Sequence, residues 1–393
     1  MKARGGRHGH SARLKLLSVA RASIALAGGL SHAASTASAA PASDNPLASE
    51  LDRDVAGAAS QFLANACHVG LSIAAVRDRT VSFYDYGSVS RERAQLATPD
   101  SIYELGSVTK TFTGALAAQA VVQRRMELDA DFRKYLPEPY PNLTWHGQPF
   151  TLRALATHRS GLPRDLPSTD DLYARKDYER LPFQLIARDG PYDRERYLRE
   201  LHDVQLTSAP GTTEAYSNLG PKVIGFGLEK VTETPFETLV ARNILQPLGM
   251  SSTGFDVDSS QRSRLVDGFS RGGNLMPYHL RNAGAAYGLY STTRDMAKYL
   301  SWQLDETNPV IRLAHQPLEG EASEGKALIW NLALDPKGKR MLWHGGGTFG
   351  TTSQVVLYPD DQQAFVLLAN DTCEGTESAL KGIAVKVHRG LAH

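Results

Sequence analysis

The sequence predicts an α+β fold in which one antiparallel sheet is assembled from both ends of the chain. Strand-like patterns occur near the N-terminus and return near the C-terminus, whereas the long middle section shows short helical patterns without sustained alternation of apolar and polar residues. The economical arrangement joins both groups of strands in one sheet flanked by helices. The middle section is then inserted as a mostly helical lobe.

The N-terminal part predicts a helix, a β-hairpin and a second helix, in that order. Apolar residues recur at helical spacing across residues 50–66. The runs 69–76 and 81–86 are apolar or β-branched, and the polar turn 77–80 between them is typical of an antiparallel hairpin. An Ala-rich helical pattern then begins near Ser107.

The remaining elements follow the same reasoning. The clearest helical patterns of the middle section lie at 192–202, 219–232 and 236–246. Strands are predicted at 327–334, 340–344, 353–358 and 364–369, and a closing helix at 377–387. We therefore expect a sheet lobe at about 50–110 and 285–393, with the helical lobe at about 111–284.

Composition excludes some classes of function. The chain of 393 residues is 41% hydrophobic and 22% charged, which is ordinary for a globular protein. Residues 1–39 hold six basic and no acidic side chains, so the rest holds 37 basic against 42 acidic ones, a net charge of −5. An acidic body argues against nucleic acid as a partner. No stretch reaches the roughly 18 apolar residues that span a bilayer.

The basic N-terminus has the layout of an export signal. Its cationic start precedes the apolar stretch 22–30 and a small-residue zone that ends before Ala40. We expect residues 1–39 to be a signal peptide and residues 40–393 to be a single domain, periplasmic or otherwise secreted, without a transmembrane anchor once the signal is removed. The alternative is a disordered tail rich in Ala and Ser.

Ser107 and Lys110 are the candidate nucleophile and its activating base. Residues three apart on a helix share a face, so the hydroxyl and the amine can meet. A buried lysine loses its proton more readily and can then activate a serine. Gly106 allows a substrate to approach the helix N-terminus. The spacing alone is weak evidence, since it also occurs at Ser323…Lys326 and Ser378…Lys381.

A second motif is Tyr216-Ser217-Asn218. A phenol can act as a general base when a neighbouring cation lowers its pKa, and the amide of Asn218 offers both a donor and an acceptor. A similar triplet, Tyr140-Pro141-Asn142, lies among prolines and is more plausibly a turn.

The third motif is His344 followed by Gly345, Gly346 and Gly347, at the end of a predicted strand. Glycines beside a basic side chain let a substrate lie against the strand edge, and a backbone N–H there can complete an oxyanion hole. The alternative without a functional role is a glycine-rich turn with an exposed histidine.

In order and spacing, these motifs resemble the class C β-lactamase family and its relatives, the low-molecular-mass penicillin-binding DD-peptidases and serine esterases. The resemblance covers roughly residues 50–372. Besides the segment 102–114 around Ser107, it includes the stretches 155–163, 209–211 and 247–250. It implies a β-lactamase/transpeptidase-like fold.

The resemblance also implies a mechanism. Ser107 would attack a carbonyl to give an acyl-enzyme, with Lys110 and Tyr216 shuttling the proton. Asn218 would hold the substrate amide, the N–H groups of Ser107 and Gly347 would form the oxyanion hole, and His344 would orient a substrate carboxylate or the leaving side. No metal or organic cofactor is implied. Expected partners are a small molecule or a peptidoglycan peptide, and β-lactams as substrate or inhibitor.

Two departures from the family pattern shape the expected activity. His344 stands where efficient class C β-lactamases usually carry lysine, and a neutral imidazole attracts a carboxylate less than an ammonium does. Arg164-Asp165 stands where those enzymes tend to have a glutamine. Both favour a peptidoglycan DD-carboxypeptidase/endopeptidase-like enzyme. A β-lactamase ranks second and an esterase third. A catalytically silent cell-wall-binding module remains the alternative from another class.

The two cysteines, Cys67 and Cys373, are too few for a disulfide scaffold. Their residue types alone allow either one bridge in an exported protein or two buried thiols. In the family that the chain resembles, the first and last strands are antiparallel neighbours at the centre of the sheet. Cys67 begins the first and Cys373 follows the last, so the resemblance implies a disulfide or a near contact.

Overall fold

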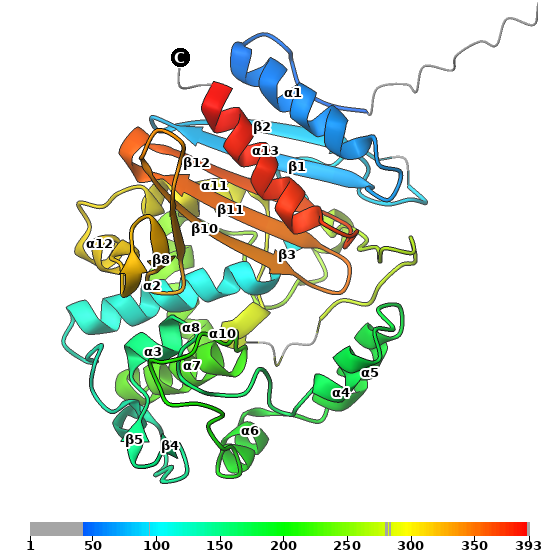
Figure 1. Ribbon diagram of the computed structural model, residues 1–393. Coiled ribbons are helices and arrows are strands. Elements are labelled where there is room, and N and C mark those ends of the chain that lie inside the picture. Colours follow the sequence, from blue (N-terminus) through cyan, green and yellow to red (C-terminus); the bar gives the residue numbers. More distant parts are fainter. Residues whose placement is uncertain (1–41, 94, 280–281, 283, 391–393) are drawn as a thin grey trace, which may run out of the picture. The chain divides into compact units, whose positions relative to one another are not determined.

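An eight-stranded antiparallel sheet organises the fold, in the order β2-β1-β12-β11-β10-β9-β8-β7 (Figure 1). The computed structural model describes residues 42–93, 95–279, 282 and 284–390. The predicted signal peptide, residues 1–39, lies outside these residues. The strands of the sheet are β1 Gly70–Arg77, β2 Thr80–Gly87, β7 Glu319–Glu321, β8 Glu324–Lys326, β9 Asn331–Leu334, β10 Arg340–Gly347, β11 Thr352–Tyr358 and β12 Gln363–Ala369.

Two-stranded pairs and helices complete the described chain. The small pairs are β3 Tyr103–Glu104 with β6 Tyr290–Ser291, and β4 Thr144–Trp145 with β5 Gln148–Pro149. The α-helices are α1 Glu50–Leu63, α2 Thr109–Val122, α3 Leu152–Ala156, α4 Asp170–Ala174, α5 Leu181–Asp189, α6 Arg194–Leu201, α7 Leu219–Thr232, α8 Phe236–Val240, α9 Gln246–Leu248, α10 Gly284–Tyr287, α11 Thr293–Gln303, α12 Pro309–His315 and α13 Thr376–Gly390. Single turns of 3₁₀-helix or π-helix are η1 Gly106–Val108, η2 Phe132–Tyr135, η3 Ala241–Leu245, η4 Arg262–Arg264 and η6 Pro359–Asp361.

The central strands are buried on both faces because helices cover each side of the sheet. In β1, Ile73 packs into a cluster with α1 and α13, whereas Ala74 and Val76 join the core on the opposite face. This alternation follows from the two-residue period of a strand. Figure 1 shows α1 and α13 lying across one face of the sheet. The second core continues into the helical lobe around α2 and α7.

Strands from the two ends of the chain meet as predicted. β1 and β12 are antiparallel neighbours, with Leu71 opposite Ala369. The prediction that these two strands lie at the centre of the sheet is wrong, since they are the second and third strands counted from the β2 edge. The reason is the polar hairpin of β7 and β8, which the sequence did not predict and which extends the other edge.

One predicted strand, 327–334, is half wrong. Only residues 331–334 form a strand, β9, while the preceding apolar residues form a buried loop. Ile329 has a φ of 73°, its N–H donates to Ala156 O, and the N–H of Leu328 donates to Ala314 O. The loop therefore packs into the core between α3 and α12, which explains its apolar composition without a strand.

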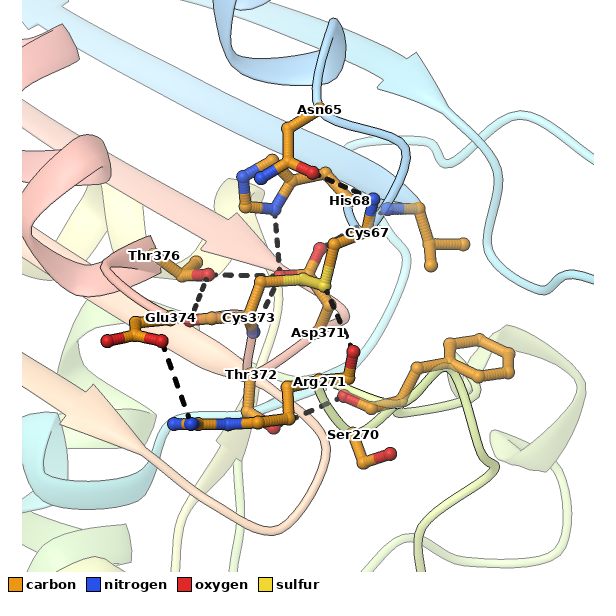
Figure 2. The surroundings of a disulfide bond; sticks show 12 residues. Asn65, Cys67, His68, Ser270, Arg271, Asp371, Thr372, Cys373, Glu374 and Thr376 are labelled. Carbon is orange, nitrogen blue, oxygen red and sulfur yellow. Dashed lines mark hydrogen bonds and ion pairs between the residues drawn. A yellow bond between two sulfur atoms is a disulfide. The ribbon is translucent and has the colours of Figure 1, made fainter. Parts of the chain in front are cut away.

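A disulfide joins Cys67 to Cys373, with the two Cα atoms 6.1 Å apart (Figure 2). It links the segment before β1 to the segment after β12. Next to it, buried Asp371 accepts hydrogen bonds from the backbone N–H of Val69 and from the Thr376 hydroxyl. Among the residues that the structure describes, no helix combines the length and apolar character needed to cross a bilayer.

Candidate active site

Ser107 and Lys110 meet at the start of α2, because a single turn of 3₁₀-helix, η1, leads directly into that helix. Lys110 Nζ donates to Ser107 Oγ at 2.9 Å. Gly106 precedes them with a φ of 51°, and a Cβ at this position would lie 2.7 Å from Gly347 O. A glycine is therefore required here by both the backbone conformation and the close approach of β10.

Lys110 has the environment of a lysine that can lose its proton near neutral pH. The side chain is fully buried, and Nζ also donates to Asn218 Oδ1 and Ala286 O, both at 2.8 Å. Burial lowers the pKa of Lys110 to about 7, although the negative charge of Asp165 opposes the shift. A substantial neutral fraction is thus available to accept a proton from Ser107.

Tyr216 completes a triangle around the nucleophile. Its hydroxyl oxygen lies 2.7 Å from Ser107 Oγ, and Lys110 Nζ lies 5.1 Å from the centre of its ring. Tyr216 is 39% exposed, but desolvation of its hydroxyl, which faces Ser107, raises the pKa of Tyr216 to about 12. The condition under which the phenol would act as a base, a pKa lowered by a neighbouring cation, is therefore not met, because desolvation outweighs both the hydrogen bond with Ser107 and the charge of Arg164. The phenol is protonated at neutral pH, where it can relay a proton but is a weak base.

Asn218 is oriented by two partners on opposite sides of its amide. Its Oδ1 accepts from Lys110, while its Nδ2 donates to Asp165 Oδ1 at 2.9 Å. Thr169 Oγ1 donates to the other oxygen of that carboxylate at 2.8 Å. The sequence reading missed Asp165 as a site residue. The sequence did contain a signal for this residue. Asp165 belongs to the stretch after Leu162-Pro163, which was interpreted only as a departure from the glutamine of the family.

His344 is neutral and held in place on β10. It is 5% exposed, and its Nδ1–H donates to Gly345 O at 2.7 Å. Burial, together with the charge of Lys110, lowers the pKa of His344 to about 3. The alternative of an exposed histidine in a turn is wrong. At neutral pH this side chain therefore offers a substrate a hydrogen-bonding group without a positive charge.

The glycines after His344 let β10 run directly against the nucleophile segment. A Cβ on Gly346 would lie 2.5 Å from Ser353 Oγ and 2.9 Å from Ser107 N. A Cβ on Gly345 would collide with Glu377 at the start of α13, whereas one on Gly347 would meet no atom within 4 Å. The backbones of Ser107 and Gly347 are thus adjacent, as a two-donor oxyanion hole needs.

These residues line a cavity of about 590 Å³. Its walls are rich in aromatic residues, and they also carry charges of both signs. The aromatic members besides Tyr216 include Tyr173, Tyr178, Tyr287, Trp343 and Phe349, and the charged ones are Arg164, Asp165, Asp189, Arg271, Lys326 and Glu377. A cavity of this size can enclose a small acyl group or part of a peptide.

The competing motif matches lie outside the triangle around Ser107. Tyr140 is buried and donates to Leu198 O, and Asn142 Nδ2 donates to Leu201 O and Val204 O. Lys381 lies on α13 with its Nζ 3.9 Å from the centre of the Trp343 ring. Lys326, in β8, does line the cavity, but its Nζ is paired with Glu214 and Asn331.

Comparison with known proteins identifies the class. Residues 55–387 match the model of the Beta-lactamase family, so the chain belongs to this family and is a serine hydrolase. It is 28% identical to a "Beta-lactamase" of Providencia stuartii over 345 residues, covering 77% of this chain and 82% of that protein.

Two further similarities were found, one in sequence and one in fold. The chain is 24% identical to "Protein flp" of Staphylococcus aureus (strain MRSA252), covering 72% of this chain but only 56% of that protein, so it spans little more than half of this relative's length. A crystal structure described as a "Beta-Lactamase/D-Alanine Carboxypeptidase" from Pseudomonas syringae superposes with a TM-score of 0.73 at 20% identity, over 88% of this chain and 100% of that one.

Proposed function

We propose that this protein is an exported serine hydrolase that cleaves amide bonds through an acyl-enzyme, as a peptidoglycan DD-carboxypeptidase/endopeptidase-like enzyme. The observation that carries the proposal is the hydrogen-bonded triangle of Ser107, Lys110 and Tyr216 within the cavity. A hydroxyl that contacts a buried lysine with a lowered pKa is an activated nucleophile.

The roles follow from the protonation states. Neutral Lys110 accepts the proton of Ser107, directly or through the Tyr216 hydroxyl, as Oγ bonds to the substrate carbonyl carbon. The N–H groups of Ser107 and Gly347 stabilise the negative oxygen that develops. The proton then passes to the leaving amine, and water releases the acyl group by the reverse sequence. Asn218 keeps one amide hydrogen for the substrate, because its other one is directed at Asp165.

Uncharged His344 argues against an efficient β-lactamase, because a cation near this position would bind the carboxylate of a β-lactam more strongly than an imidazole with a pKa of about 3 does. The free terminal carboxylate of a carboxypeptidase substrate would be bound weakly for the same reason, so within the peptidase proposal the histidine favours the endopeptidase-like reaction. The second candidate is nevertheless a β-lactamase, which is favoured by the name of the Providencia stuartii relative. The two functions differ in how fast water removes the acyl group.

Export is part of the proposal and rests on residues 1–39. Their basic, apolar and small-residue zones follow one another in the order of a secretory signal. Expression of the full chain in a Gram-negative bacterium should deliver a periplasmic protein whose N-terminus, determined by mass spectrometry, begins near Ala40. A cytoplasmic protein that retains residues 1–39 would contradict this part of the proposal.

Labelling with a fluorescent penicillin tests the catalytic part. We expect covalent labelling of the wild-type protein, slow decay of the label, and no labelling of Ser107→Ala. Ser323→Ala is the matched control, since it removes the serine of a competing motif and should label normally. Rapid turnover with little trapped label would instead identify a β-lactamase. Equal labelling of Ser107→Ala would refute Ser107 as the nucleophile.

A further inference from the structure

Three side chains unrelated to the proposed reaction converge on one point at another part of the fold. Asp335 follows β9, Asp361 lies in η6 between β11 and β12, and His388 is near the end of α13. The His388 side chain is 2% exposed, while the carboxylates of Asp335 and Asp361 are 4% and 15% exposed. None of the three lines the cavity around Ser107.

We propose that Asp335, Asp361 and His388 form a binding site for a divalent transition-metal ion, with zinc as the ion that fits best. His388 Nε2 lies 3.4 Å from Asp335 Oδ2 and 3.4 Å from Asp361 Oδ2. Tetrahedral zinc with bonds of about 2.0–2.2 Å places its ligand atoms about 3.4 Å apart. Both nitrogen–oxygen distances thus match the spacing of zinc ligands, and the ligand atoms of the three residues all lie within 4.8 Å of one another.

The imidazole presents a lone pair to the two carboxylates. His388 Nδ1 lies 3.1 Å from Gln363 Oε1, which can only accept, so the ring hydrogen of the neutral imidazole is on Nδ1. Nε2 then faces two anionic oxygens, and it is buried without a hydrogen-bond partner. Two carboxylates and a lone pair repel one another unless a metal ion lies between them or a proton is bound to Nε2. A metal-bound histidine that donates its other N–H to an oxygen is the usual arrangement.

The carboxylates are already fixed through their other oxygens. Asp335 Oδ1 accepts from the backbone N–H groups of Lys337 and Lys339, at 2.8 and 2.9 Å. Asp361 Oδ1 is paired with the Lys339 ammonium. In both residues Oδ2 is directed at His388. An adjoining cavity of about 270 Å³, lined by Asp335, His388 and Arg389 among others, leaves room for a water molecule as the fourth ligand.

A second group of candidate ligands, His68, Asp371 and Cys373, does not support such a site. Cys373 is in a disulfide and has no thiolate to offer. His68 Nδ1 is hydrogen-bonded to Asp371 Oδ1 at 3.0 Å. Of the two groups of candidate ligands in the described parts of the chain, only the one around His388 therefore has an imidazole lone pair directed at two carboxylates.

An ion there would tie α13 to two turns of the sheet and so stabilise the folded chain. The test uses the full chain, stripped with a chelator and dialysed. We expect one equivalent of zinc by elemental analysis and calorimetry, and a Tm raised by about 3–4 °C at a hundredfold excess over Kd. The rate of labelling by a fluorescent penicillin should be the same with and without added zinc. Cobalt should give the intense visible absorption of a tetrahedral ion.

Variants decide whether the zinc occupies this site. His388→Gln and Asp335→Asn should each abolish the zinc-dependent rise in Tm. His202→Gln should keep it, because His202 is an exposed histidine with a single carboxylate partner, Glu138. If the variants fold poorly, the cobalt spectrum of the wild-type protein remains decisive. No bound zinc, an octahedral cobalt spectrum, or equal binding by His388→Gln would overturn the proposal and leave His388 as a protonated bridge between two carboxylates.

Discussion

Replacing Gly346 by alanine tests how closely β10 must approach the nucleophile. A Cβ at this position would lie 2.9 Å from Ser107 N and closer still to Leu105 O, although Cβ atoms essentially never come within 3.0 Å of such atoms. The strand and the Ser107 segment must therefore separate by up to about 1 Å. Because a misplacement of about 1 Å at a reacting centre costs on the order of 100-fold in rate, Gly346→Ala should acylate roughly 100-fold more slowly.

The neighbouring glycine provides a matched control. A Cβ on Gly347 would meet nothing within 4 Å, and alanine keeps the backbone N–H of the proposed oxyanion hole. The assay is the second-order rate constant for labelling by a fluorescent penicillin, and thermal unfolding verifies that both variants are folded. Gly347→Ala should label within a fewfold of the wild type. The reasoning is refuted if Gly346→Ala labels at the wild-type rate, or if both variants lose the same activity while folded.

Three further changes have defined outcomes. The rate of penicillin labelling should rise with pH through about 7 as Lys110 loses its proton. Asp165→Asn should move the midpoint of this pH profile to lower pH, because the Asp165 carboxylate raises the pKa of Lys110. A midpoint that is unmoved or raised in the variant would exclude this effect of Asp165 on Lys110. The Cys67–Cys373 bridge closes a loop of 306 residues, and its reduction should lower the free energy of unfolding, measured in urea, by about 2–4 kcal/mol. In a Cys67→Ala/Cys373→Ala variant the reductant should leave the free energy of unfolding unchanged. Phe112→Ala should cost about 3–5 kcal/mol in the same assay, because Phe112 is fully buried and stacked 3.9 Å from Tyr299; a cost below about 1 kcal/mol would contradict its role in anchoring α2.

Features that depend on local geometry could be predicted from the amino-acid sequence. Ser107 and Lys110 are three residues apart on a helix, so their contact follows from helical spacing alone. The apolar runs at 69–76 and 364–369 predicted strands, and the corresponding strands β1 and β12 pair as neighbours. The segment 327–330 failed because an apolar run indicates burial but does not distinguish a strand from a buried loop.

Features that depend on distant residues and on burial could be read only from the folded chain. Tyr216 reaches Ser107 across 109 positions of the chain, and Asp165 orients Asn218, a pairing that no local pattern encodes. The protonation states of Lys110, Tyr216 and His344 follow from desolvation in the folded cavity. The residue types limit which chemistry a site can perform. The protonation state of each group depends on the surrounding dielectric and on the distances between charges, and only folding establishes these.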